Sequence, residues 1–464
     1  MTASDVATLY SRTASQRARA WVTVWAIVLL VSGQGFRYLL GIPAYTVVTV
    51  MTIAAVAVVF RRFLRPFRVP LVLSMFVGLA ALSVLWSATR AVSVLAVVVL
   101  AATTFLGVAI ARGTSRGQFM AFLYRGLQVS LFGGILFELF VAVVVRADLP
   151  PFANDLGERA GVDPAELPLW SRNNLFAGGP LQGFVGNRNP FAAIALFAAI
   201  VAVVLMLEKR IKRVDGLLTL AGAAFVHLFT LSATITIAAL YVSVLAAAAL
   251  LIRRAPEPRK RVLSFTVLAC SAIVAVVTIK FRAEIFGIFD RDSDATNRIR
   301  IWDQVAHYAM QRPEGWGYVG YWPIWEDPYK TIVEDAGVVA SHAHNAFLDA
   351  WLQLGLIGLV LLLVIVVLVF GSAWRLVERA SAGDTYIPLG WALLTAALAL
   401  QSLTESRMLV EWGWFLLVVL ACSAPQVFAL TIVDPALVRT GSPPDDEAEA
   451  EDPVSVLSRE LRKS

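Results

Sequence analysis

Long uncharged apolar runs are the feature that most limits what this chain can fold into. A helix needs about 20 apolar residues to cross a bilayer. Only helices and closed barrels satisfy their backbone polar groups in lipid, and the sequence lacks the alternating strands of about ten residues that build a barrel. It therefore predicts an all-α polytopic integral membrane protein with about 12 transmembrane helices. The expected spans lie near residues 20–38, 42–60, 69–87, 91–111, 120–145, 189–207, 215–232, 234–252, 262–280, 350–373, 386–404 and 410–430.

The composition excludes one large soluble domain. Of the 464 residues, 58% are hydrophobic and 16% are charged, whereas soluble domains average about 45–50% and about 25%. Cys270 and Cys422 both lie in apolar runs, so the sequence offers no disulfide framework and no cysteine zinc site. A net charge of +6 could suggest a nucleic-acid partner, but the positions of the basic residues indicate membrane topology instead.

Basic residues cluster before the first expected span or after an even-numbered one. The clusters are Arg12, Arg17 and Arg19; Arg61, Arg62, Arg65 and Arg68; Arg112, Arg116 and Arg125; Lys209, Arg210, Lys212 and Arg213; Arg253, Arg254, Arg259, Lys260 and Arg261; and Arg375 and Arg379. Positive charge near span ends marks the cytoplasmic side. We therefore expect residues 1–19 and the flexible acidic tail 431–464 to be cytoplasmic, in a multi-pass protein of the bacterial cytoplasmic membrane.

Two long connections then fall on the extracytoplasmic side. Residues 146–188 separate the spans of 20–145 from those of 189–280, and residues 281–349 separate these from the spans of 350–430. Connections of this length are usually functional or disordered. Between them the two connections carry Trp, Tyr, Pro, Arg and His, which is not the composition of a disordered linker. We expect the functional site in these loops.

Two histidines, His342 and His344, lie just before the span at 350–373. A neutral histidine at physiological pH can act as a general base. The spacing also offers two nitrogens to a metal, but no third ligand is obvious beside them, and neither an HEXXH motif nor a cysteine pair is present. No metal is therefore expected. Helix capping or interfacial packing is the alternative role for this segment.

Arginines in the outer loops are candidate anion ligands. Residues 297–311 predict a helix with Arg298 and Trp302 on one face and Arg300 on another. The guanidinium fork matches a phosphate or diphosphate, although a salt bridge within the loop is an alternative. Arg188 opens a span at an outward-facing helix N-terminus, where an anion is favoured. Nearby aromatic residues could stack on sugar rings or anchor the loop at the lipid headgroups; they include Trp302, Trp316, Tyr318 and Trp322.

Several short motifs follow one another in a fixed order over residues 185–370. They are Gly186-Asn187-Arg188-Asn189-Pro190, Arg298-x-x-x-Trp302, Pro313-x-Gly315-x-Gly317, His344-Asn345-x-x-Leu348 and Gly355-x-x-Gly358. In this order, and on the outer side of about twelve spans, they resemble the O-antigen ligase and O-antigen polymerase superfamily. One position departs from the family pattern. The chain has Leu231-Ser232-Ala233-Thr234 where members often carry Ser-Arg-Gly, so the expected arginine is missing.

The resemblance implies a GT-C-like membrane glycosyltransferase that works without a cofactor or metal and inverts the anomeric centre. Its partners would be the bilayer, a polyprenyl-diphosphate-linked glycan donor, and a glycan or glycolipid acceptor. His344 matches the motif histidine and would be the base, with His342 second and Asn345 beside it. Arg298, Arg300 and Arg188 would hold the diphosphate. Trp302, Trp316, Tyr318 and Trp322 would contact the glycan.

Two other functions fit the apolar runs. A transporter or flippase of lipid-linked glycans would also need many spans, but transporters usually place ionisable residues near the bilayer midplane and show paired repeats. A non-catalytic scaffold for envelope assembly is the third hypothesis. The concentration of polar residues in the outer loops favours the enzyme.

Overall fold

The computed structural model describes residues 3–64, 69–153, 169–280, 293–337, 340–381 and 383–424. The whole of the expected tail 431–464, and parts of both long loops, therefore lie outside the described residues. The helices are α1 (Ala3–Val31), α2 (Gly33–Phe60), α3 (Leu71–Ser83), α4 (Arg90–Gly113), α5 (Arg116–Phe140), α7 (Arg188–Leu207), α8 (Arg213–Thr230), α9 (Ala233–Arg254), α10 (Glu257–Lys280), α12 (Ser293–Gln311), α13 (Tyr329–Ala336), α14 (Ala346–Arg379), α15 (Ile387–Gln401) and α16 (Glu411–Cys422). Short turns are η1 (Arg61–Phe63), η2 (Val141–Val145) and η4 (Ser406–Leu409).

The expectation of a polytopic helical membrane protein is confirmed. Within the described residues, six helical segments are long and apolar enough to cross a membrane: Gly33–Phe63, Arg90–Gly113, Arg116–Val145, Arg188–Leu207, Ala233–Arg254 and Ala346–Arg379. The apolar helices α3, α15 and α16 are shorter. Each of the twelve expected spans overlaps a helix, but twelve crossings stays a prediction. The first boundary differs from expectation, because α1 ends at Val31 and α2 runs through to Phe60 with a break at Gly41.

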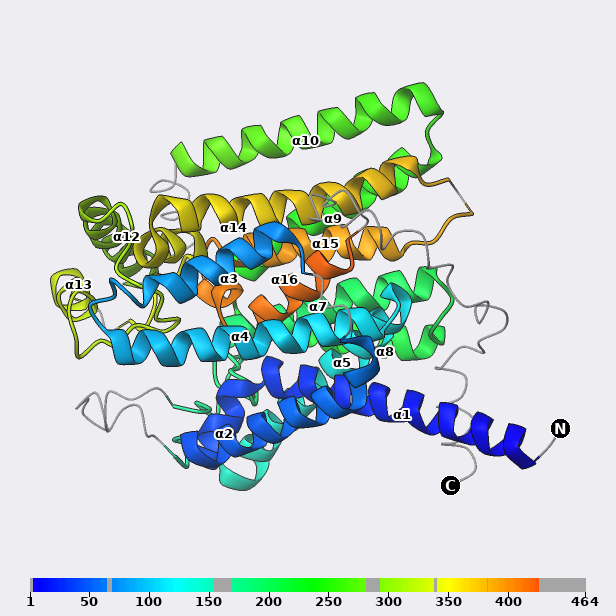
Figure 1. Ribbon diagram of the computed structural model, residues 1–464, viewed down its shortest axis with the longest axis horizontal. Coiled ribbons are helices and arrows are strands. Elements are labelled where there is room, and N and C mark those ends of the chain that lie inside the picture. Colours follow the sequence, from blue (N-terminus) through cyan, green and yellow to red (C-terminus); the bar gives the residue numbers. More distant parts are fainter. Residues whose placement is uncertain are drawn as a thin grey trace.

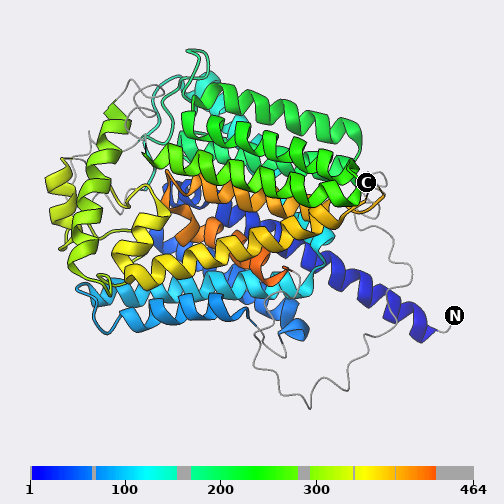
Figure 2. The same ribbon diagram turned by 90° about the horizontal axis from the view of Figure 1, so that it is seen from above.

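The long helices lie side by side along the longest axis of the molecule (Figure 1). Both views place α12 and α13 at one end of this bundle and the N-terminus at the other (Figures 1 and 2). The helices α12 and α13 enclose a small core of their own, which includes Ile301, Val305 and Ile332 and reaches Leu352 of α14. The described residues 293–337 of the second long loop therefore form a folded cap on the bundle.

Small residues bring the central helices together. In α7, Ala192, Ala195 and Ala198 are at most 1% exposed. Close backbone approach through small residues is typical of helix packing in membranes. Outer helices carry exposed large apolar side chains instead, as Val47 and Met51 of α2 do. Such an outer surface suits contact with lipid tails.

A break in α14 docks the cap onto the bundle. Gly355 has φ 66°, which favours glycine. At the break, Trp316 N donates to Leu352 O at 2.9 Å and Gly317 N donates to Gln353 O at 2.9 Å. A Cβ atom on Gly355 would lie 1.9 Å from Pro313 O. The Pro313-x-Gly315-x-Gly317 segment and the break at Gly355 are thus two sides of one contact.

We predict that Gly355→Ala destabilises the protein by at least about 2 kcal/mol, since it combines a strained backbone with a steric clash. Gly371→Ala in the same helix is the matched control, because a Cβ there meets nothing within 4 Å. It should be neutral or stabilise by up to about 1 kcal/mol through helix propensity. Thermal unfolding in detergent measures both. Equal unfolding temperatures for the two variants would contradict the docking role of Gly355.

Candidate functional site

A buried carboxylate, Glu405, is the centre of the candidate site. It lies in the connection between α15 and α16, and its side chain is 5% exposed. Its Oε1 accepts a hydrogen bond from Asn189 Nδ2 at 3.1 Å and lies 3.9 Å from Arg298 Nη2. Its Oε2 lies 3.8 Å from His342 Nε2 and 3.9 Å from His344 Nδ1. Residues from three distant parts of the sequence therefore meet at one carboxylate.

The start of α9 also reaches this centre. Ser232 Oγ donates to Asn189 Oδ1 at 2.9 Å. Asn187 caps α7 by accepting from Asn189 N, which leaves the side-chain amide of Asn189 to join Ser232 and Glu405. The segment around Ser232, where the family arginine is missing, therefore lies next to the site.

The backbone between the two histidines is fixed from both sides. Ala343 N donates to Asp349 Oδ2 at 3.0 Å, and Ala343 O accepts from Trp302 Nε1 at 2.9 Å. Asp349 is fully buried, and its Oδ1 accepts from Trp322 Nε1 at 2.7 Å. His344 adopts φ 50°, a left-handed conformation that is uncommon for a non-glycine residue. Both tryptophans and Asp349 thus hold the histidine segment in place.

The two histidines differ in environment. His342 Nδ1 accepts a hydrogen bond from His344 N at 3.0 Å, so its neutral ring carries the proton on Nε2, which faces Glu405. Burial lowers the pKa of His342 well below 6.5, and the neighbouring His344, Arg407 and Arg298 lower it further. His342 is therefore neutral at physiological pH. The side chain of His344 is 28% exposed and that of His342 is 12% exposed, so His344 is the more open of the two.

A second charged cluster adjoins the first. Glu411, at the start of α16, pairs with Arg37 of α2 and lies 3.3 Å from Arg407 Nη1. The ring of Tyr321 lies 6.3 Å from that of His342, and burial raises the pKa of Tyr321 to about 12, with Glu411 adding to the rise. Tyr321 is therefore a neutral phenol between the two clusters.

The other expected site residues have these positions. Asn345 caps α14, accepting from Phe347 N at 3.0 Å and Leu348 N at 3.1 Å. Arg300 is exposed on α12, outside the Glu405 centre. Arg188 is half-buried at the start of α7, next to Asn189.

The expected glycan-contacting aromatics mostly have partners inside the protein. Trp316 Nε1 donates to Tyr308 O at 3.0 Å, and Arg312 lies over its ring. Tyr318 is 2% exposed and donates to Leu409 O at 2.7 Å. Trp322 is 3% exposed. In this structure, Tyr318 and Trp322 are buried inside the protein and do not line an open surface. Glycan contact by any of the four aromatics stays a prediction.

Sequence reasoning missed Glu405, Arg407, Glu411, Arg37 as an ion-pair partner, and Asp349. One signal was available. The segment Thr404-Glu405-Ser406-Arg407 places two ionisable residues between apolar runs. Burying an ionisable side chain in a membrane costs free energy, so such residues usually mark a functional site. The pairing of Arg37 with Glu411 gave no local signal, because 374 positions separate them in the sequence.

Glu405 is also the third potential metal ligand that the sequence did not reveal. One ligand atom each from His342, His344 and Glu405 lies within 4.8 Å of the others. The surroundings are unfavourable for a cation. Arg298 faces the same carboxylate, and both Arg298 and Arg407 act electrostatically on His342. This donor set fits an ion-pair centre better than a metal site, since positive charge opposes a cation.

We predict that the stability of the protein falls with acidification below about pH 6.5. The folded state holds His342 neutral while the unfolded state takes up a proton near pH 6.5, so the unfolded state binds more protons as the pH falls. Stability from this group is complete above about pH 6.5 and is lost below it. His342→Gln should flatten this slope in thermal unfolding at a series of pH values. The exposed His307 offers the control variant His307→Gln. An unchanged slope in His342→Gln would contradict the assignment.

Comparison with known proteins agrees with the resemblance expected from the motifs. Residues 217–363 match a family model described as O-antigen ligase. The exopolysaccharide production protein ExoQ of Rhizobium meliloti (strain 1021) is 32% identical over 176 residues. That match covers 35% of this chain and 39% of the relative. The chain therefore matches well under half the length of this curated relative.

The matched region contains Ser232, Arg298, His342 and His344, whereas Asn189 and Glu405 lie outside it. Four of the residues that gather at the carboxylate thus belong to the part of the chain that carries the family pattern. The resemblance of this chain to the O-antigen ligase superfamily is therefore confirmed over residues 217–363.

Proposed function

We propose that the protein is a glycosyltransferase of cell-surface polysaccharide biosynthesis. It transfers a glycan from a polyprenyl-diphosphate carrier to an acceptor hydroxyl, on the outer face of the cytoplasmic membrane. The main support is the convergence of Asn189, Arg298, His342 and His344 on Glu405. Arg298 belongs to α12, and both views place α12 at the end of the bundle away from the N-terminus (Figures 1 and 2).

His344 is the general base in this proposal. Its Nδ1 lies beside Glu405 Oε2, which leaves Nε2 to take the proton of the acceptor hydroxyl. A carboxylate beside one ring nitrogen orients the ring and stabilises the imidazolium that forms. The acceptor oxygen then bonds to the anomeric carbon while the bond from that carbon to the diphosphate oxygen breaks. A single displacement of this kind inverts the anomeric centre.

The departing diphosphate needs positive charge nearby. The arginine side chains of the site supply this charge, because they outnumber its carboxylates. Two carboxylates, Glu405 and Glu411, face three guanidinium groups, those of Arg298, Arg37 and Arg407. Since Arg37 and Arg407 share Glu411, the surplus positive charge lies in their half of the site. Arg407 Nε is buried without a hydrogen-bond partner, so this guanidinium is not fully satisfied within the protein.

Arg37 and Arg407 thus join Arg298 as diphosphate ligands in the proposal and take the role of the family arginine that is missing beside Ser232. Arg188, at the start of α7, could add charge from the neighbouring side, while Arg300 is less favourably placed. The proposed reaction needs no metal ion, because in it the guanidinium groups supply the positive charge that a metal ion would otherwise bring.

We predict that His344→Asn lowers transfer at least about 100-fold, the usual contribution of a general base. Asparagine tolerates the left-handed backbone at this position, so the fold should survive. Glu405→Gln should lower transfer by about tenfold or more. The measurement is glycan transfer by purified protein with a lipid-linked donor, together with donor binding, which should change little in His344→Asn.

The control is His307→Asn on the exposed face of α12, which should keep wild-type turnover. A chelator should also leave the rate unchanged. Wild-type turnover in His344→Asn would remove the base assignment, and loss of activity in chelator that a divalent ion restores would overturn metal independence. Movement of the lipid-linked glycan across liposome membranes without a glycan product would favour the flippase instead.

We predict opposite effects from the two partners in the second charged cluster. Arg407→Gln removes the surplus charge but leaves Glu411 paired with Arg37, so donor affinity should fall about tenfold or more while the fold persists. Glu411→Gln frees both guanidinium groups, so donor affinity should rise or hold. Binding of undecaprenyl diphosphate measures both. If both variants lost affinity equally, the cluster would be structural and the diphosphate role would fail.

A further inference from the structure

A polar pocket lies at the opposite end of the bundle from Glu405. Its volume is about 310 Å³, and its walls come from the first turns of α10 and the last turns of α14. The lining residues are Glu257, Lys260, Arg261, Arg375, Glu378 and Arg379. Figure 1 shows α10 at the edge of the bundle next to α14, so the pocket has one side toward the surroundings of the protein.

The pocket carries a surplus of positive charge. Four of its lining residues are cations and two are carboxylates. Glu257 is engaged by Lys260, whose Nζ donates to Glu257 Oε1 at 2.8 Å and to Ala380 O at 3.0 Å. The side chain of Lys260 is 4% exposed, so Lys260 forms the buried floor of the pocket. Arg261, Arg375 and Arg379 are exposed and add three guanidinium groups at the rim.

An apolar surface begins next to this charged pocket. On α10, Val262 is 65% exposed and Phe265 is 73% exposed, within about one helical turn of Arg261. On α14, Val367 is 64% exposed two turns before Arg375. A cationic pocket that continues into exposed apolar helix faces suits an amphiphile with an anionic head and hydrocarbon tails. A soluble anion would need the pocket but not these faces.

We propose that this pocket binds the headgroup of an anionic phospholipid. The phosphate lies among Arg261, Arg375 and Arg379, and the acyl chains run along the exposed faces of α10 and α14. Basic pockets between membrane helices bind such headgroups on the arginine-rich side of a membrane. The site is separate from the Glu405 centre, and the proposal does not depend on the transfer reaction.

A lipid-binding measurement tests this proposal. The full chain is reconstituted in phosphatidylcholine nanodiscs with and without cardiolipin, and retained cardiolipin is counted by native mass spectrometry. Wild-type protein should prefer cardiolipin over phosphatidylcholine at least about tenfold. The triple variant Arg261→Gln/Arg375→Gln/Arg379→Gln should lose most of this preference. Lys260 is left intact because of its buried contacts.

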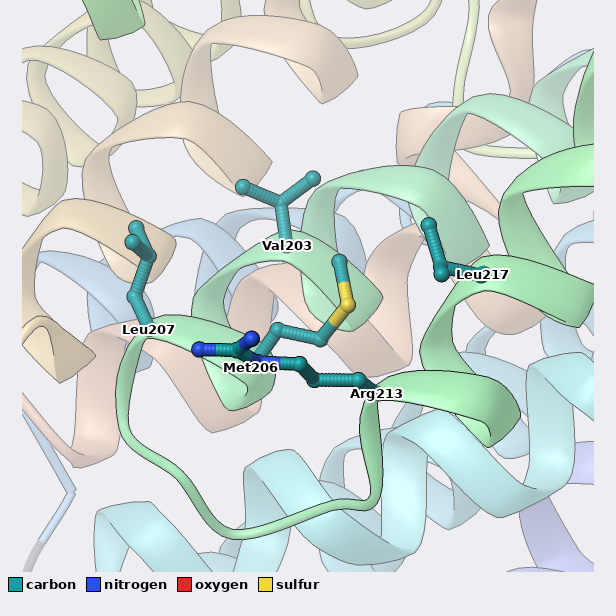
Figure 3. A pocket seen from close by; sticks show the side chains of 5 residues that line it. All are labelled: Val203, Met206, Leu207, Arg213 and Leu217. Atoms are coloured by element: carbon teal, nitrogen blue, oxygen red, sulfur yellow. The ribbon is translucent and has the colours of Figure 1, made fainter.

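The control removes the same charge elsewhere at this end of the bundle. The variant Arg61→Gln/Arg62→Gln/Arg213→Gln affects two arginines of η1 and one beside an apolar pocket between α7 and α8. That pocket is lined by Val203, Met206, Leu207, Arg213 and Leu217 (Figure 3). This variant should keep the preference.

Equal loss of the cardiolipin preference in both triple variants would show that the preference depends on overall charge alone, and this result would overturn the proposed site. Full retention in the α10 and α14 variant would overturn it as well. Complete displacement of cardiolipin by glycerol phosphate would show that the pocket selects a soluble anion instead of a lipid.

Discussion

The burial of the Glu405 carboxylate is the constraint on which the site depends. A charge that is 5% exposed must be paired or hydrogen-bonded, since an isolated buried carboxylate costs several kcal/mol or more. Its partners come from the start of α7, from α12 and from the segment before α14. The ends of these elements must therefore meet at one point. Loss of any partner leaves charge or donors unsatisfied, so the carboxylate fixes the arrangement of the cap on the bundle.

Two further buried carboxylates organise the loops around this centre. Asp349 fixes the backbone between His342 and His344. Glu138 of α5, 1% exposed, accepts from Ser171 Oγ at 2.8 Å and from Gly183 N at 2.6 Å. Glu138 thus anchors the first long loop just before it leads into α7 and Asn189. Each acceptor binds backbone or side-chain donors of a loop, which is how irregular backbone is held rigid near a membrane.

Much of the fold was predictable because hydropathy and basic clusters report directly on helices in lipid. The segments that gather at the site were also predictable in part, because the order of the motifs assigned His344 and Arg298 to the same long loop. The packing of Gly315 and Gly317 against the break at Gly355 was not, because a three-dimensional contact leaves no local pattern. Glu405 was missed for the same reason, since its partners lie far away in the sequence. Trp322 was expected at a surface and is buried, because an indole can serve as a donor to Asp349 as readily as it can stack on a sugar.

The most direct test of the account is a structure of the protein with a bound polyprenyl-diphosphate donor, determined in nanodiscs by electron cryomicroscopy. We expect the diphosphate to lie between Arg298 and Arg407, with the anomeric carbon beside an open path to His344 Nε2. A diphosphate bound elsewhere, with His344 enclosed by protein and Arg407 still engaged only with Glu411, would contradict it.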